Sequence, residues 1–333
     1  MKILIDENKT QYKANLHCHT VHSDGKWTPL QVKEEYKKRG YSVVAITDHE
    51  HLINHSALSD NEFLFITGYE MYVMSLPFDY LNDSQSHMNL YSKTPENKML
   101  YYTPSITKYI PKEELENLQY HKLVENRELT VDFIRQTVED AKKCGFLVCH
   151  NHPTWSFENE AFAPAYDNCF AMEMYNNGSY QMGYSEYNQH YYDYQCNRGL
   201  EMGVICADDN HNTTDNPYWD AFGGMTYILA DSLEYGEIIK AMENRNFYAS
   251  TGPRIFSLSA ENGVLKVETS RAERILFVTN NHYRKAVRAK ENETLTTAEF
   301  VVDERIKWVR VEVVDYEGKR AFSRAYRVKE ILE

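Results

Sequence analysis

The sequence predicts an α/β barrel followed by a small antiparallel β domain, on two observations. Short apolar or β-branched runs alternate with amphipathic helical segments up to about residue 250. Such alternation is typical of parallel strands joined by right-handed crossovers, and several units in succession favour a barrel. Beyond about residue 253, apolar and polar residues alternate every second position, which is typical of antiparallel strands.

The first helix is predicted over residues 28–40. Thr28 has the position of an N-cap, Pro29 occupies the first helical position and Gln31 completes a capping box. The β-branched run 41–47 follows at once. This run is too short for a buried helix, so we predict a strand there.

The same alternation continues along the chain and defines the remaining elements. Helices are predicted at 130–145, 184–198 and 233–243. Strands of the barrel are predicted at 63–67, 146–149, 170–174 and 203–206, and strands of the C-terminal part at 274–279, 299–302 and 308–314. We therefore expect a barrel domain over residues 1–252 and a β domain over residues 253–333.

The segment from about residue 75 to residue 128 interrupts this alternation. It is long, polar and rich in tyrosine. A loop of this length in a compact enzyme often covers a functional site. We expect the insertion to cover the site of this protein.

Composition excludes several classes of function. The chain has 36 Lys and Arg against 49 Asp and Glu, a net charge of −13, whereas a duplex-binding protein needs a basic face. No apolar run approaches the ~18 residues of a membrane-spanning helix. The first residues lack the pattern of a signal peptide, so we expect a cytoplasmic protein. The six cysteines are scattered, which disfavours a disulfide framework or a cysteine zinc site.

Histidines and acidic residues gather where predicted strands give way to loops. In Asn15-Leu-His-Cys-His19 the two imidazoles are two residues apart, so in a strand they face the same side and form half of a metal site. Strand ends of an α/β barrel converge on one mouth. The candidates that we expect to meet there are His17, His19, Asp24, His49, Glu70, His87, His152, Asp209 and His211.

These side chains are all imidazoles or carboxylates, without a thiolate. Such ligands suit Zn²⁺, Mn²⁺ or Fe²⁺. Nine ligands are too many for one ion, so we expect two or three divalent ions that share a bridging carboxylate. A mixed set of this kind leaves positions open for water and substrate, as a catalytic metal site requires.

The motifs resemble those of the PHP family, named for polymerase and histidinol phosphatase, in sequence order. They are His17-x-His19 with Asp24, Thr47-Asp-His49, His152-Pro153 and Asp209-x-His211, with Glu70 and His87 at intermediate ligand positions. The resemblance covers residues 14 to 250. It implies a distorted (β/α)7 PHP barrel with a bi- or trinuclear site. The C-terminal part, with Tyr-Ala-Ser-Thr-Gly-Pro at 248–253, is similar to a two-domain branch that includes carbaryl-hydrolase-like metallohydrolases.

The resemblance also implies which residues hold each ion. The implied first set is His17, His19, Glu70 and Asp209. The implied second set is Glu70, His87 and His152. The implied third set is Asp24, His49 and His211.

Several residues beside these motifs have two open interpretations. His22, His51 and His150 are either substrate contacts or supporting residues, and the supporting role is favoured. Arg254 is either a contact to a substrate phosphate, because a guanidinium holds two oxygens at once, or part of a surface ion pair. Tyrosines at helical spacing more often pack a helix than form a binding platform, and these are Tyr180, Tyr184, Tyr187 and Tyr191.

We therefore expect a metal-dependent phosphoesterase acting on a small phosphorylated metabolite. Clustered cations neutralise the phosphate and lower the pKa of bound water toward ~7, which supplies a metal-activated hydroxide. His211 or His22 is the candidate that protonates the leaving oxygen. Two alternatives stay open. The same metals could hydrolyse a carboxylic or carbamic ester or an amide, or the barrel could be inert and act as a binding or regulatory module.

Overall fold

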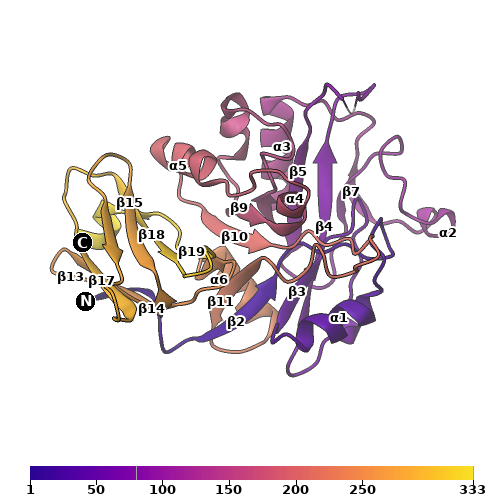
Figure 1. Ribbon diagram of the computed structural model, residues 1–333. Coiled ribbons are helices and arrows are strands. Elements are labelled where there is room, and N and C mark those ends of the chain that lie inside the picture. Colours follow the sequence, from indigo (N-terminus) through magenta and orange to yellow (C-terminus); the bar gives the residue numbers. More distant parts are fainter. Residues whose placement is uncertain (80, 333) are drawn as a thin grey trace.

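The computed structural model describes residues 1–79 and 81–332. The fold is mixed α/β, and one large sheet runs through the molecule (Figure 1). The strands along this sheet are, in spatial order, β10 (Gly203–Ala207), β9 (Ala171–Asn176), β8 (Phe146–His150), β5 (Ser86–Ser92), β4 (Leu64–Val73), β3 (Val43–Ile46), β2 (Thr10–Asn15), β11 (Met225–Ala230), β12 (Phe247–Ser250), β19 (Arg320–Phe322), β18 (Trp308–Val314), β15 (Arg274–Thr279) and β16 (Lys285–Arg288). β20 (Tyr326–Arg327) pairs with β18.

The sheet contains both parallel and antiparallel pairs. β2, β3 and β4 pair in parallel, as do β8, β9 and β10. β5 lies between these two groups and is antiparallel to both of its neighbours, and β11 is antiparallel to β2. The predicted strands are confirmed, but the prediction of a wholly parallel sheet is wrong, because β5 comes from the segment expected to be an irregular loop.

The ladder does not close between β10 and β11. One side chain, that of Thr226, connects these two strands. Its hydroxyl accepts from Cys206 N at 3.3 Å and donates to Cys206 O at 3.1 Å. A closed barrel of main-chain hydrogen bonds is therefore not confirmed in the described residues. The carboxyl ends of β2, β3, β8 and β10 carry the segments that hold most of the candidate ligands.

The helices follow the predicted capping signals. α1 (Pro29–Lys37) has the capping box of Thr28 and Gln31. α3 (Val131–Lys143) is capped by the Thr130 side chain, and α6 (Tyr235–Glu243) also lies as predicted. The helix predicted over 184–198 is shorter than expected. It is α5 (Gln189–Asn197) and is preceded by α4 (Asn177–Gln181), so the four tyrosines do not share one helix.

The insertion contains regular structure besides β5. β6 (Met99–Tyr102) and β7 (Tyr120–Leu123) form a small parallel pair, with α2 (Lys112–Leu115) between them in the chain. Two 3-10 segments lie elsewhere, η1 (Ser56–Leu58) and η2 (Glu160–Tyr166). In the described residues no helix is long and apolar enough to cross a membrane.

The C-terminal part is antiparallel, as predicted. A second sheet has the order β1 (Lys2–Ile5), β13 (Ile255–Glu261), β14 (Val264–Ala272) and β17 (Leu295–Val301), and α7 (Val328–Leu332) follows near the end of the chain. The N-terminal strand β1 therefore lies among the C-terminal strands (Figure 1). The division of the chain near residue 253 stays a prediction.

A buried ion pair anchors the insertion to the sheet. The guanidinium of Arg127 donates to both carboxylate oxygens of Glu50, with 2.8 Å from Nη2 to Oε2, and also to Thr103 and to Tyr72 O. Both charged side chains are fully buried. Glu50 in turn accepts from Tyr72 N at 2.9 Å. This contact holds the end of the insertion beside the loop that carries His49.

We expect Arg127→Met to lower the free energy of unfolding by about 3–5 kcal/mol, because removing one partner leaves a buried charge without compensation. Urea denaturation measures the change. Arg135→Met, which removes a partly exposed arginine from α3, is the control and should change stability by about 0.5 kcal/mol or less. Equal stabilities of the two variants would contradict the anchoring role.

Candidate metal centre

The segment after β2 carries the first two candidate ligands. It is extended, and a parallel bridge joins Cys18 to Asn210. Side chains two apart in an extended segment point the same way, so the Nε2 atoms of His17 and His19 lie 3.1 Å apart. Both residues lie just past the end of β2 at Asn15. They face the same space as predicted, although they are outside the regular strand.

Glu70 lies within β4 and not at its end, which corrects the prediction. The parallel pairing of β4 with β3 ends at Thr67, and β4 continues because β5 supplies an antiparallel partner. An isolated bridge joins Glu70 to His49 in the loop after β3. Glu70 is therefore still at the sheet edge where β3 ends.

His87 is held by the sheet and not by an irregular loop. It lies on β5, in register with Tyr72 of β4. Its ring contacts two aromatic side chains, with centroid distances of 5.7 Å to Tyr72 and 5.2 Å to Trp155. These two aromatic neighbours fix the orientation of His87 toward Glu70.

The remaining candidates follow β8 and β10. His152 lies two residues past β8, and Asp209 follows β10. Asp209 has a φ of 53°, a region that few non-glycine residues adopt, and its N donates to His17 O at 2.9 Å. The buried Asp220 accepts from His211 N at 2.7 Å. These bonds hold the loop after β10 against the segment after β2.

The carboxylate of Glu70 lies at the centre of the cluster. Its Oε1 is 3.1 Å from His87 Nδ1 and 3.1 Å from His152 Nε2. Its Oε2 is 3.0 Å from His49 Nδ1 and 3.4 Å from His19 Nε2. One buried carboxylate thus contacts imidazoles from four different segments, which is the geometry expected of a bridging ligand.

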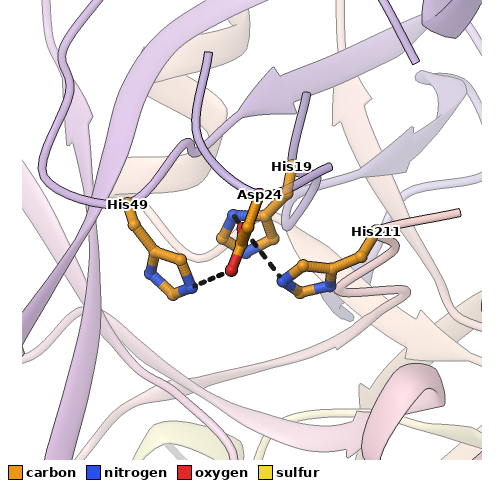
Figure 2. Close-up of side chains that lie close together, drawn as sticks. All are labelled: His19, Asp24, His49 and His211. Atoms are coloured by element: carbon orange, nitrogen blue, oxygen red, sulfur yellow. Dashed lines mark ion pairs between the residues drawn. The ribbon is translucent and has the colours of Figure 1, made fainter. Parts of the chain in front are cut away.

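Two aspartates flank this centre. Asp209 Oδ1 is 3.0 Å from His19 Nε2. Asp24 lies on the more open side, with Oδ1 3.4 Å from His211 Nε2 and Oδ2 3.6 Å from His49 Nε2 (Figure 2). All nine predicted ligands belong to the cluster, which also includes Glu173.

The donor atoms form four overlapping groups, in each of which they lie within 4.8 Å of one another. These groups are His17, His19, Glu70 and Asp209; His19, Asp24, His49 and His211; His49, Glu70 and His87; and His17, His152 and Glu173. The first equals the first set that the PHP resemblance implies, and the second contains the implied third set. The implied second set is divided between groups. Which residues hold which ion stays a prediction.

Two imidazoles of the cluster are oriented by a polar partner at Nδ1. His17 Nδ1 lies 2.7 Å from Glu173 Oε1, and His152 Nδ1 lies 3.3 Å from Ser156 Oγ. Such a partner directs the other ring nitrogen at a metal. Glu173 is fully buried on β9 and also accepts from His152 N. Glu173 is not among the residues predicted from the sequence. Its position as an acid inside the apolar run 170–174 is the signal that distinguishes it.

The donor set fits divalent cations. Three buried atoms, His49 Nδ1, Glu70 Oε2 and Asp209 Oδ1, make no hydrogen bond in the described residues, although Glu70 Oε2 is only 3.0 Å from His49 Nδ1. Burial lowers the pKa of His19, but hydrogen bonds and charge from Asp209 and Glu70 outweigh it and raise that pKa to about 10. The cluster therefore favours positive charge at its centre, and its nitrogen and oxygen donors suit metal ions.

Two predicted catalytic residues lie outside the cluster. The ring of His22 contacts His51 and His55 and does not line the cavity. Arg254 donates to Gln11 at 2.7 Å, near the start of β2 and thus at the opposite end of the strand from the ligands. The ring of His22, in the loop after Thr20, thus faces His51 and His55, and Arg254, just before β13, lies near the start of β2.

His150 has the supporting role that the sequence favoured. Its Nε2 lies 2.9 Å from Glu158 Oε2, and its ring stacks on Tyr166 at 3.6 Å. His51 is also supporting, because it is buried and its Nε2 lies 3.3 Å from Glu114 of α2.

The cluster forms the floor of a cavity of about 610 Å³. The insertion contributes to its wall through Phe78, Lys108 and Tyr109. Tyr109 stacks on His49, with centroids 6.0 Å apart, and its hydroxyl donates to Asp24 Oδ2 at 3.4 Å. The insertion thus borders the site, as predicted.

Comparisons with known proteins give fold similarity only. No family model and no curated protein matches the sequence. Among solved structures, the chain is similar to a two-domain protein containing a predicted PHP-like metal-dependent phosphoesterase from Bacteroides vulgatus, with 15% identity, a TM-score of 0.46, and coverage of 95% of this chain and 94% of that one. The function of this protein is therefore inferred from the geometry of its own donor cluster.

Two further structures are similar at a lower level. A protein named as a metal-dependent phosphoesterase from Bifidobacterium adolescentis has 14% identity and a TM-score of 0.42, over 70% of this chain and 96% of that one. An amidohydrolase from Chromobacterium violaceum, with bound sulfate and no metal, has 14% identity and a TM-score of 0.38, over 60% of this chain and 87% of that one.

A buried carboxylate positions Trp155 beside the ligands. Glu186 accepts from Trp155 N at 2.5 Å and from Asn188 Nδ2 at 2.6 Å. Burial raises the pKa of Glu186 to about 7. An unfolded glutamate titrates near 4.5, so between pH 4.5 and pH 7 the folded protein binds more protons and its stability falls as the pH rises.

We expect Glu186→Gln to remove this pH dependence. We compare the free energy of unfolding of this variant with that of the natural protein. The variant's advantage should be about 2 kcal/mol larger at pH 7 than at pH 5. Urea denaturation at both pH values measures it. Glu304→Gln changes an exposed glutamate and should show no such difference. A Glu186→Gln effect that is the same at both pH values would refute the assignment.

Proposed function

We propose that the protein is a metal-dependent hydrolase whose reaction is the hydrolysis of a phosphate ester of a small metabolite. One observation carries this proposal. Glu70 lies buried among the imidazoles of four segments, beside polar atoms that lack hydrogen bonds, and this cage opens into a cavity. The donor set suits two or three divalent ions such as Zn²⁺, Mn²⁺ or Fe²⁺.

Bound ions would supply neutralising charge for the phosphate oxygens and a lowered pKa for water. The residues of this chain have distinct parts in the reaction. Glu173 orients the imidazole of His17, and Ser156 orients that of His152, each through the Nδ1 atom of the ring. Glu70 holds the two halves of the cluster together through both of its oxygens.

The side of the cluster that faces the cavity is where the substrate binds. His211 and Asp24 are the more exposed members of the cluster, at 26% and 38%. Water adds to phosphorus as the phosphorus–oxygen bond to the leaving group breaks, and the departing oxygen takes up a proton. We assign His211, in its protonated form and not bound to an ion, to donate this proton. Burial and the charge of Asp24 raise the pKa of Tyr109 to about 12. This phenol therefore keeps its proton at neutral pH and donates a hydrogen bond.

A second candidate is hydrolysis of a carboxylic or carbamic ester or an amide at the same centre. The apolar and aromatic side chains of the cavity wall favour it, because they suit a neutral substrate. These side chains are Tyr72, Met74, Phe78, Tyr109, Trp155, Met182 and Trp219. An inert binding module is the third candidate, and it gives no reason for a complete set of nine clustered donors.

We expect protein loaded with manganese or zinc to hydrolyse p-nitrophenyl phosphate in preference to p-nitrophenyl acetate. Initial rates of p-nitrophenol release, measured side by side, test this expectation. Exclusive cleavage of the acetate would replace phosphoesterase by the second candidate. A metal-loaded protein that is inactive on both compounds and on a broad panel of phosphate esters would favour the binding module.

We expect His17→Ala and Asp209→Asn each to lower the metal content and abolish turnover, because each removes a donor from the centre of the cluster. Elemental analysis, activity and circular dichroism measure metal, function and fold separately. His190→Ala is the matched control, since this histidine is 92% exposed on α5. Normal metal content in both site variants would contradict the proposed centre.

A further inference from the structure

The cavity is large for a phosphate alone. Its volume of about 610 Å³ falls in the range of pockets that hold ligands of roughly 300–1,000 Å³. Above the ligand floor the wall is formed mostly by the seven apolar and aromatic side chains named above. Trp155 contacts the ligands directly, with its ring 5.0 Å from the ring of His152. The wall therefore offers an apolar surface beside the metal ligands to a bound molecule.

Lys108 differs from every other residue along the cavity. Of the described residues that line it, this is the one lysine or arginine, whereas Asp24, Glu70, Asp209 and Asp220 contribute four carboxylates. Lys108 is exposed, and within residues 1–79 and 81–332 it forms no ion pair. A cation at the mouth of such a cavity is available to a ligand.

The segment that carries Lys108 is held in place. Its neighbours Ile106 and Ile110 are buried, and Ile106 O accepts from the Tyr72 hydroxyl at 3.0 Å. Lys108 Nζ lies 5.1 Å from the centre of the Tyr109 ring, which itself stacks on His49. A continuous wall thus leads from the metal ligands to Lys108.

We propose that the substrate carries a second anionic group, separated from the scissile ester by an apolar body, and that Lys108 binds this group. The substrate class is then an aryl or similarly bulky ester with a distal carboxylate or phosphate. This inference rests on the proposed function only in placing the ester at the metal ligands. The apolar wall and the distal cation explain together why the cavity exceeds the size of a phosphate.

Binding of two phosphonates that are not hydrolysed tests this inference. Zinc-loaded protein is titrated with benzylphosphonate and with 4-carboxybenzylphosphonate, by calorimetry or by the fluorescence of the tryptophans in the wall. We expect the carboxylated compound to bind about two- to fivefold more tightly at low salt, as an added ion pair with an exposed lysine gives. The ratio should fall as salt is raised.

Lys108→Gln should bring the affinity ratio of the two compounds to about one. The control is Lys112→Gln, which changes an exposed lysine of α2 outside the cavity lining and should leave the ratio as in the natural protein. A Lys108→Gln protein with the natural ratio overturns the inference, and so does a natural protein that binds both compounds equally. Turnover of phenyl phosphate and 4-carboxyphenyl phosphate is measured in parallel. Absence of turnover with a ratio that depends on Lys108 would reject the phosphoesterase and keep the anion site.

Discussion

The central constraint in this structure is the burial of mutually facing nitrogen and oxygen donors around Glu70. Lone pairs of imidazoles and carboxylates repel one another at 3.0–3.4 Å unless a proton or a cation lies between them, and burial strengthens that repulsion. The raised pKa values of His19 and His152, about 10 and about 9, express the same demand for positive charge, which here overcomes the opposing effect of burial. Metal ions meet this demand without protonating the ligands.

The fold meets this constraint by bringing the ends of several strands of one sheet together. The parallel strands supply the segments after β2, β3, β8 and β10, and the antiparallel strand β5 supplies His87 from the interior of the sheet. The same insertion provides the cavity wall at Lys108 and Tyr109 and is anchored by the buried pair of Arg127 and Glu50. One segment of the chain therefore contributes to the core, to the donor cluster and to the cavity wall.

A layer of supporting contacts links the ligands to the rest of the protein. Glu173 bonds both His17 Nδ1 and His152 N, and Glu186 holds the backbone of Trp155 against the rings of His87 and His152. Such contacts fix ring orientation and ligand basicity. They also join the donor cluster at the floor of the cavity to the cavity wall, because Trp155 lines the wall and contacts the rings of His87 and His152.

The sequence by itself determined the local elements and the candidate ligands. Capping residues such as Thr28 and Thr130 act within one turn, and motifs such as His17-x-His19 need only an extended backbone. Tertiary structure alone decided that β5 enters the centre of the sheet, that Glu173 faces His17, and that Arg254 lies far from the ligands. The physical reason is that strand partners and side-chain directions depend on contacts between segments distant in sequence, which spacing and composition do not encode.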